Sequence, residues 1–106
     1  MKRTVWMSYD LGVSGDYEGL YAWLDDLDAK ECGNSVAYFS FSYDGDLLES
    51  LKAEIEDAVS LNKRARIYII CRDNGETKGR FIIGGRKSGP WDGFGTHEAD
   101  GDDRAF

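Results

Sequence analysis

Two stretches of the chain alternate apolar and polar side chains with the period of a β-strand. The first is residues 4–10, which ends in a carboxylate just before a glycine turn. The second is residues 35–43, in which Ala37, Phe39 and Phe41 fall on one face. Each stretch is therefore predicted to be a strand with one buried face.

Two shorter apolar runs follow in the second half of the chain. Residues 66–72 are rich in β-branched side chains, which is typical of an interior strand. Residues 79–84 form the last predicted strand. The intervening sequence Asp-Asn-Gly-Glu at residues 73–76 favours a tight turn, so these two strands are expected to form a hairpin.

Two segments between the strands carry apolar side chains at helical spacing. Asp16 is a suitable N-cap for a first helix, and Asp46 with Glu49 resembles a capping box at the start of a second. The apolar face is predicted to comprise Tyr17, Leu20, Tyr21, Leu24 and Leu27 in the first helix, and Leu47, Leu48, Leu51, Ile55, Ala58 and Val59 in the second.

The predicted element order β-α-β-α-β-β places two helices on one face of a mainly antiparallel sheet, which is an α+β two-layer sandwich. A chain of 106 residues has room for one hydrophobic core. We therefore expect a single α+β domain over residues 1–89. The Gly- and Asp-rich tail at residues 90–106 is expected to be partly disordered.

Charge is distributed unevenly along the chain. The formal net charge is −7, yet residues 63–87 carry 8 basic and 2 acidic side chains, whereas residues 1–62 carry 4 and 13. A local positive potential can attract the phosphates of RNA or DNA even when the whole molecule is acidic. The alternative is that these basic side chains balance the negative charge of the acidic helices. The basic candidates for nucleic-acid binding are Arg66, Arg72, Lys78, Arg80, Arg86 and Lys87.

Aromatic side chains on the predicted strands are a second candidate for nucleic-acid contact, because bases stack on exposed rings of RNA-binding sheets. Trp6, Tyr38 and Tyr68 lie on strands, as do Phe39 and Phe41. Alternation assigns the two phenylalanines to the core. Tyr38 and Tyr68 lie in the opposite register and are the residues that we select as candidate binding residues.

Asp10 is the candidate for metal binding or catalysis, because it ends the first predicted strand next to Gly12. A carboxylate at a strand end can hold Mg²⁺ for phosphodiester cleavage. The other interpretation is that it caps the loop by accepting hydrogen bonds from backbone amides around Gly12. Magnesium needs more oxygen ligands than one carboxylate, so a site here would require a dimer mate or the substrate.

The remaining composition limits the alternatives. No apolar run reaches the roughly 20 residues needed to cross a bilayer, and Met1–Thr4 lead into a strand, so we expect a soluble cytoplasmic protein with no membrane partner. Cys32 and Cys71 fit no metal-ligand spacing and are interpreted as reduced, packed thiols, with a disulfide as the alternative. The lone histidine, His97, argues against a Ser/His/Asp or Cys/His catalytic site.

The chain resembles a known family in four places: the strand ending Ser8-Tyr9-Asp10-Leu11, the strand entry Gly33-Asn34-Ser35-Val36, the strand Ile67-Tyr68-Ile69-Ile70 and the strand Phe81-Ile82-Ile83-Gly84. It is similar there to the small CRISPR spacer-acquisition subunit and to the related virulence-associated toxin ribonucleases. The resemblance implies a ferredoxin-like fold and a homodimer built through sheet edges. It also implies nucleic-acid binding, with Asp10 pairing across the dimer to hold a divalent metal. The acidic first helix departs from the family, whose first helix is usually basic.

Three functions follow as hypotheses. The first is a homodimeric, ferredoxin-like module associated with nucleic acid, weakly catalytic or not catalytic. The second is a metal-dependent nuclease that uses Asp10. The third is an acidic regulatory factor that binds a basic protein partner and no nucleic acid. Whether the chain is an enzyme is left open by the sequence.

Overall fold

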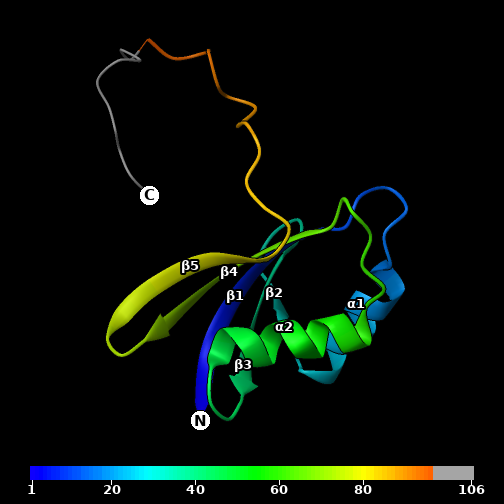
Figure 1. The fold of residues 1–106 in the computed structure, drawn as a ribbon, viewed down its shortest axis with the longest axis vertical. Helices are drawn as coiled ribbons and strands as arrows, with labels where there is room; N and C mark the ends of the chain where they lie inside the picture. The colour runs from blue at the N-terminus through cyan, green and yellow to red at the C-terminus, as the bar shows by residue number, and fades with distance from the viewer. Residues whose placement is uncertain (97–106) are drawn as a thin grey trace.

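The computed structural model describes residues 1–96, so the part of the predicted disordered tail at residues 97–106 lies outside the described residues, as does His97. The elements follow one another as β1 (Lys2–Asp10), α1 (Tyr17–Asp26), β2 (Lys30–Glu31), β3 (Val36–Ser42), α2 (Leu47–Ala58), β4 (Arg66–Asp73) and β5 (Glu76–Ile83) (Figure 1).

One five-stranded antiparallel sheet forms the body of the molecule, with the strand order β2-β3-β1-β4-β5. The predicted α+β class with two helices is therefore confirmed. The predicted element order lacked β2, a two-residue strand with both side chains exposed. A strand this short has no apolar pattern, and it forms because its backbone pairs with Ala37 and Tyr38 of β3.

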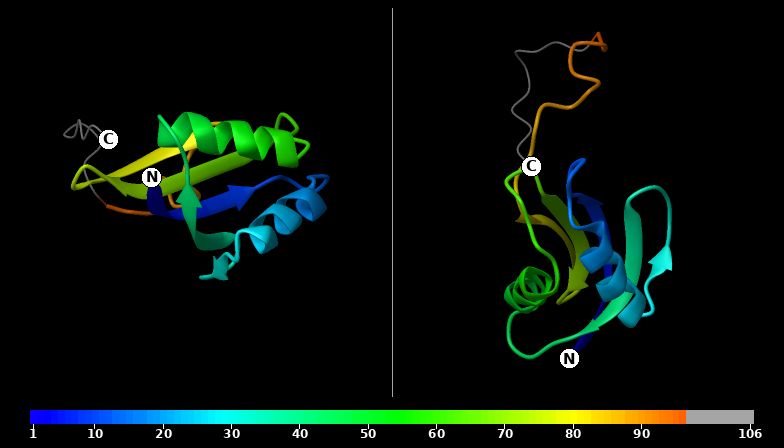
Figure 2. Two further views of the ribbon diagram at one scale, coloured as in Figure 1. Left: turned by 90° about the horizontal axis from the view of Figure 1, so that it is seen from below. Right: turned by 90° about the vertical axis from the view of Figure 1, so that its right-hand side faces the viewer.

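Both helices cover the same face of the sheet, and the core lies between the two layers (Figure 2). The ring of Trp23 in α1 meets Phe39 of β3 edge-on, with 5.4 Å between the ring centroids. Leu47 of α2 and Ile69 of β4 are both buried and line the same hollow between the layers. The sheet contributes Val5, Met7, Ala37, Phe39, Phe41, Ile67, Ile69, Cys71 and Ile82 to the core, so the assignment of Phe39 and Phe41 to the core is confirmed.

The buried face of α1 differs from the predicted one in two residues. Trp23 is buried with Leu20 and Leu24, whereas Tyr21 is exposed. Tyr21 instead lies with its ring 6.2 Å from that of Tyr9 at the rim of the core. Trp23 lies three residues after Leu20 and therefore on the same side of the helix, and its size makes it the more favourable residue to bury.

Asp16 connects the start of α1 to the end of α2. One carboxylate oxygen accepts a hydrogen bond from Gly19 N and the other from Ser60 N, each at 2.9 Å. These two backbone donors lower the pKa of Asp16. Gly19 permits the close approach, since a Cβ there would collide with the Asp16 carboxylate and lie 2.9 Å from the Ala58 carbonyl oxygen. Gly19 thus serves the packing of α1 against the end of α2.

The predicted hairpin is confirmed by the antiparallel pairing of β4 with β5, and it reaches beyond the other strands of the sheet (Figure 1). Asn74 and Gly75 have φ values of 51° and 79°, as a type I′ turn requires. β5 begins at Glu76, three residues earlier than predicted, because the two-residue turn lets β4–β5 pairing start at the residue directly after Gly75.

The segment after β5 runs away from the sheet (Figures 1 and 2). Its aromatic residues Trp91 and Phe94 are 73% and 85% exposed.

The two cysteines are free. Cys71 is buried, which raises the pKa of its thiol. Cys32 is exposed, so the expectation that it is packed is wrong. Across residues 1–96, no helix is long and apolar enough to cross a membrane.

Candidate nucleic-acid interface

The sheet face opposite the helices, here called the open face, displays a group of aromatic and aliphatic side chains. Trp6, Tyr38 and Ile70 are 43%, 40% and 41% exposed. The register places Trp6 between Tyr38 on β3 and Ile70 on β4. Strand alternation sends their neighbours in sequence into the core, so these side chains must face outward. Exposed rings gathered on one sheet face are an available stacking surface.

The rings on the open face form two pairs. Trp6 and Tyr38 stack with 6.3 Å between centroids and 29° between planes. Tyr68 and Phe81 meet edge-on with centroids 4.8 Å apart, because the register set by the hairpin turn places them directly opposite each other. Residues directly or diagonally opposite across strands are about 5–8 Å apart, so Ser8 and Ile70 join the two pairs into one surface.

A hollow of about 410 Å³ opens on this face beside Tyr68 and Phe81. We call it the arginine groove, and it is lined by Ser8, Asp10, Arg66, Tyr68, Phe81 and Arg86. A second hollow of about 520 Å³ continues it over Arg66, Phe81 and Arg86 towards residues 87–92. Aromatic rings and guanidinium groups thus line one continuous concave surface, the combination that holds bases and phosphates together.

Arg66 is the central cation of the arginine groove. Its Nη2 lies 3.7 Å from Asp10 Oδ2, directly across the β1–β4 ladder. Its Nε is buried and has no hydrogen-bond partner. Buried donors are nearly always satisfied in folded proteins, so this N–H is an exception, and a shift of the Arg66 side chain towards a ligand oxygen would satisfy it.

Arg86 lies on the other side of the groove, with its guanidinium carbon 5.8 Å from the centre of the Phe81 ring, a cation–π arrangement. Gly84 brings the chain to this position. Its φ is 71°, and a Cβ there would lie 2.5 Å from the Ala65 carbonyl oxygen and 3.0 Å from Arg66 Cγ, so a larger residue would push the segment away from the start of β4. Glycine at this position therefore holds the two arginines on one groove.

Asp10 acts as a loop cap in this chain. Its Oδ1 accepts a hydrogen bond of 3.0 Å from Gly12 N, and its side chain is 56% exposed. Within residues 1–96, no group of three or more His, Cys, Asp or Glu side chains is arranged to hold a metal ion. A Mg²⁺ ion at Asp10 would therefore need oxygen ligands from a second molecule. Metal binding and catalysis by Asp10 stay predictions.

The predicted basic residues do not form one patch. Arg66, Arg86 and Lys87 line the two hollows of the open face. Lys78 and Arg80 lie on the helix-side face of β5, next to the start of α2, and Lys78 lies 3.8 Å from Asp73. At the hairpin turn, Arg72 donates a hydrogen bond of 3.1 Å to the Gly75 carbonyl oxygen. Three of the six predicted basic residues thus line the two hollows, and Arg72 lies on the same face of β4, two residues beyond Ile70.

Tyr38 and Tyr68 both lie on the open face, as the sequence predicted, but Phe81 was not selected. The turn at Asn74-Gly75 could have predicted the position of Phe81, because a two-residue hairpin loop fixes which β5 residue lies opposite each β4 residue. Trp6 lies on a predicted strand but is not among the binding residues selected from the sequence.

Comparison of the chain with known protein families, with curated proteins and with solved structures finds no match.

Proposed function

We propose that this protein is a homodimeric, ferredoxin-like module that binds nucleic acid on its open face and is weakly catalytic or not catalytic. The observation that carries the proposal is the arginine groove, in which Tyr68 and Phe81 adjoin Arg66 with its buried, unpaired Nε. Bases that stack on the rings would place their phosphates within reach of Arg66 and Arg86. RNA and DNA both carry these two groups.

The element order and sheet order support the ferredoxin-like part of the proposal. A ferredoxin-like fold has the order β-α-β-β-α-β, which corresponds to β1 through β4 here. The four strands lie as β2-β3-β1-β4, and β5 is added at the β4 edge. This added strand supplies Phe81 to the open face, so it is part of the proposed site.

β5 also supports the homodimer. It is an edge strand of 8 residues, with β4 on one side and no strand of the described chain on the other. Such an edge can pair with the same edge of a second copy and join two open faces. Sedimentation equilibrium is expected to give twice the chain mass of 11.9 kDa. A monomer at all concentrations would contradict the dimer.

Salt-dependent binding of a labelled single-stranded oligonucleotide tests the proposal, with two arginine variants as a matched pair. Arg86→Ala removes a groove cation and is expected to weaken binding and to lower the slope of log K against log salt by about 0.7. Arg80→Ala removes one positive charge from the helix-side face of β5, away from the groove, and is expected to leave the slope unchanged. No binding at low salt, or equal effects of both substitutions, would contradict the proposal.

Asp10→Asn separates the binding proposal from the nuclease alternative. The amide keeps an acceptor for Gly12 N but removes the negative charge beside Arg66. An exposed ion pair is worth up to about 1 kcal/mol, so oligonucleotide affinity is expected to rise by up to about fivefold. The measurement is the dissociation constant of wild type and variant at equal salt.

A nuclease that holds Mg²⁺ through Asp10 gives the opposite pattern. Cleavage of the oligonucleotide in Mg²⁺ would then be present in the wild type and lost in the Asp10→Asn variant, with the fold intact by circular dichroism. Such a loss of cleavage would contradict the non-catalytic proposal and support the nuclease alternative. Cleavage that survives the substitution would exclude Asp10 as the metal ligand.

A further inference from the structure

The outer edge of β3 is only partly covered. β2 pairs with Ala37 and Tyr38 alone, and Cys32 N donates to the Val36 carbonyl oxygen just before them. The backbone groups of alternate residues in a strand point to opposite edges. Val36 bonds to Cys32 and Gly33 at this outer edge, whereas Tyr43 bonds to Met1 on the β1 side. The N–H and C=O groups of Ser40 and Ser42 therefore point to the outer edge, as those of Val36 do. Within the described chain these outward groups of the two serines have no backbone partner.

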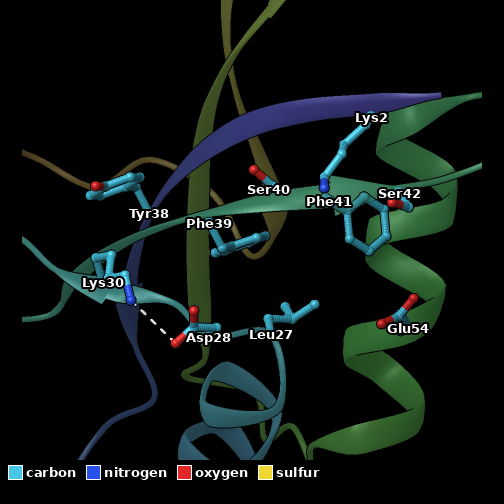
Figure 3. A pocket seen from close by; sticks show the side chains of 10 residues that line it. All are labelled: Lys2, Leu27, Asp28, Lys30, Tyr38, Phe39, Ser40, Phe41, Ser42 and Glu54. Carbon is cyan, nitrogen blue, oxygen red and sulfur yellow. Dashed lines mark hydrogen bonds and ion pairs between the residues drawn. The ribbon is translucent and has the colours of Figure 1, made fainter.

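A hollow of about 530 Å³ lies along this uncovered part of β3 (Figure 3). Lys2, Tyr38 and Ser40 lie on the open-face side of the strand (Figure 3). Leu27 and Glu54 lie on the helix side (Figure 3). The hollow therefore offers different chemistry to the two sides of anything that lies along the edge.

We propose that this edge binds an extended peptide segment of another protein, which adds a strand in line with β2. The N–H and C=O groups of Ser40 alternate with those of Ser42, and a polypeptide backbone supplies matching acceptors and donors at the required spacing of about 6.8 Å per two residues. Neither a nucleic acid nor a small anion offers this series of donors and acceptors.

The side chains around the edge specify the peptide. A residue opposite Ser42 would point to the open-face side, near Lys2, which makes no ion pair in the described part of the chain. An acidic side chain is favoured there. The next residue would point to the helix side, near Leu27 and Glu54. Glu54 already accepts a hydrogen bond from Trp23 Nε1, and an aliphatic side chain that contacts Leu27 is favoured there over an acidic one. The preferred segment therefore carries an acidic residue next to an aliphatic one.

Fluorescence anisotropy with a labelled peptide of sequence Thr-Glu-Val-Glu-Thr tests this site. Ser40→Pro removes the outward N–H and leaves the ladder to β1 in place, since proline is tolerated where the N–H faces away from the sheet. It is expected to weaken binding about tenfold, whereas Ser40→Ala is expected to change it less than twofold. The matched peptide Thr-Lys-Val-Lys-Thr is expected to bind at least about threefold more weakly.

A second measurement keeps the test decisive if Ser40→Pro does not fold. N-methylation of the peptide residue opposite Ser40 removes the complementary donor and is expected to weaken binding to the unchanged protein about tenfold. Equal binding of the methylated and unmethylated peptides, or no binding of the unmethylated peptide at millimolar concentration, would overturn the proposal.

Hydrogen exchange identifies which molecule occupies the edge. The amides of Ser40 and Ser42 are expected to exchange rapidly in the free protein and to become protected when the peptide is added. Protection that appears without peptide and increases with protein concentration would show that a second copy occupies the edge, which would overturn the peptide proposal. Protection of these amides by oligonucleotide alone would also overturn it.

Discussion

Tyr68→Ala is expected to weaken binding of a single-stranded oligonucleotide by about 5- to 150-fold. The estimate follows from the stacking of one base on an aromatic ring, which is worth about 1–3 kcal/mol. Tyr68 is at the centre of the open face, where it meets Phe81 and lines the arginine groove with Arg66. The measurement is a titration of labelled oligonucleotide with wild type and variant at the same low salt concentration.

Tyr21→Ala is the matched control for this substitution. Tyr21 is an exposed tyrosine on α1, next to Tyr9 and Tyr17 and on the helix side of the molecule. Its removal deletes the same phenol but no part of the open face, so affinity is expected to stay within twofold. If the two substitutions weaken binding equally, the binding surface does not lie on the open face.

Phe39→Ala is expected to lower the free energy of unfolding by about 3–5 kcal/mol, which is a large share of the stability of a domain this size. Phe39 is buried between the sheet and α1, where its ring meets that of Trp23. Truncation would leave a cavity that the layers on either side cannot fill. Urea unfolding monitored by circular dichroism measures the change.

The adjacent residue provides the comparison. Tyr38 lies on the same strand but on the open face, where it is partly exposed against Trp6. Tyr38→Ala is expected to cost less than about 1.5 kcal/mol of stability while weakening oligonucleotide binding. If both substitutions destabilise equally, the two faces of β3 do not differ in the way that the fold requires.

The long elements could be predicted from the sequence because each has a strong local signal. α2 has a capping residue, Asp46, whose carboxylate accepts a hydrogen bond from Glu49 N, and an unbroken apolar stripe. The β4–β5 hairpin has an Asn-Gly turn with positive φ at both residues. β2 could not be predicted, because its two residues are held only by partners on β3.

The site could be predicted only in part. Alternation correctly put Tyr38 on the outer face of its strand and Phe39 in the core. Which basic side chains share a face with Tyr68 depends on the pairing of β4 with β5. This pairing is regular from Asp73 to Tyr68 and shifts between Tyr68 and Ile67. The regular part places Arg80 opposite Ile69 on the helix side, whereas Arg86 follows the shift and lines the arginine groove, so the two arginines lie on different faces although they are close in sequence.

The unpaired Nε of Arg66 is likewise a property of the folded chain alone. The Arg66 side chain lies beside Gly84 and opposite Asp10, whose carboxylate is near Nη2 and leaves Nε without a partner. The sequence indicates that Arg66 begins a strand and that Asp10 ends one. It does not indicate that the two residues are opposite each other, which is a consequence of antiparallel pairing between strands far apart in sequence.

Nuclear magnetic resonance of the indole N–H groups tests nucleic-acid binding on the open face most directly, because the chain carries internal reporters on both sides of the sheet. Trp6 lies on the open face, whereas Trp23 lies in the core, where its Nε1 donates a hydrogen bond of 3.1 Å to Glu54. When a single-stranded oligonucleotide is added at low salt, the Trp6 indole signal is expected to shift and the Trp23 signal to stay unchanged. A titration in which binding occurs but Trp6 does not shift, or in which Trp23 shifts instead, would contradict the account.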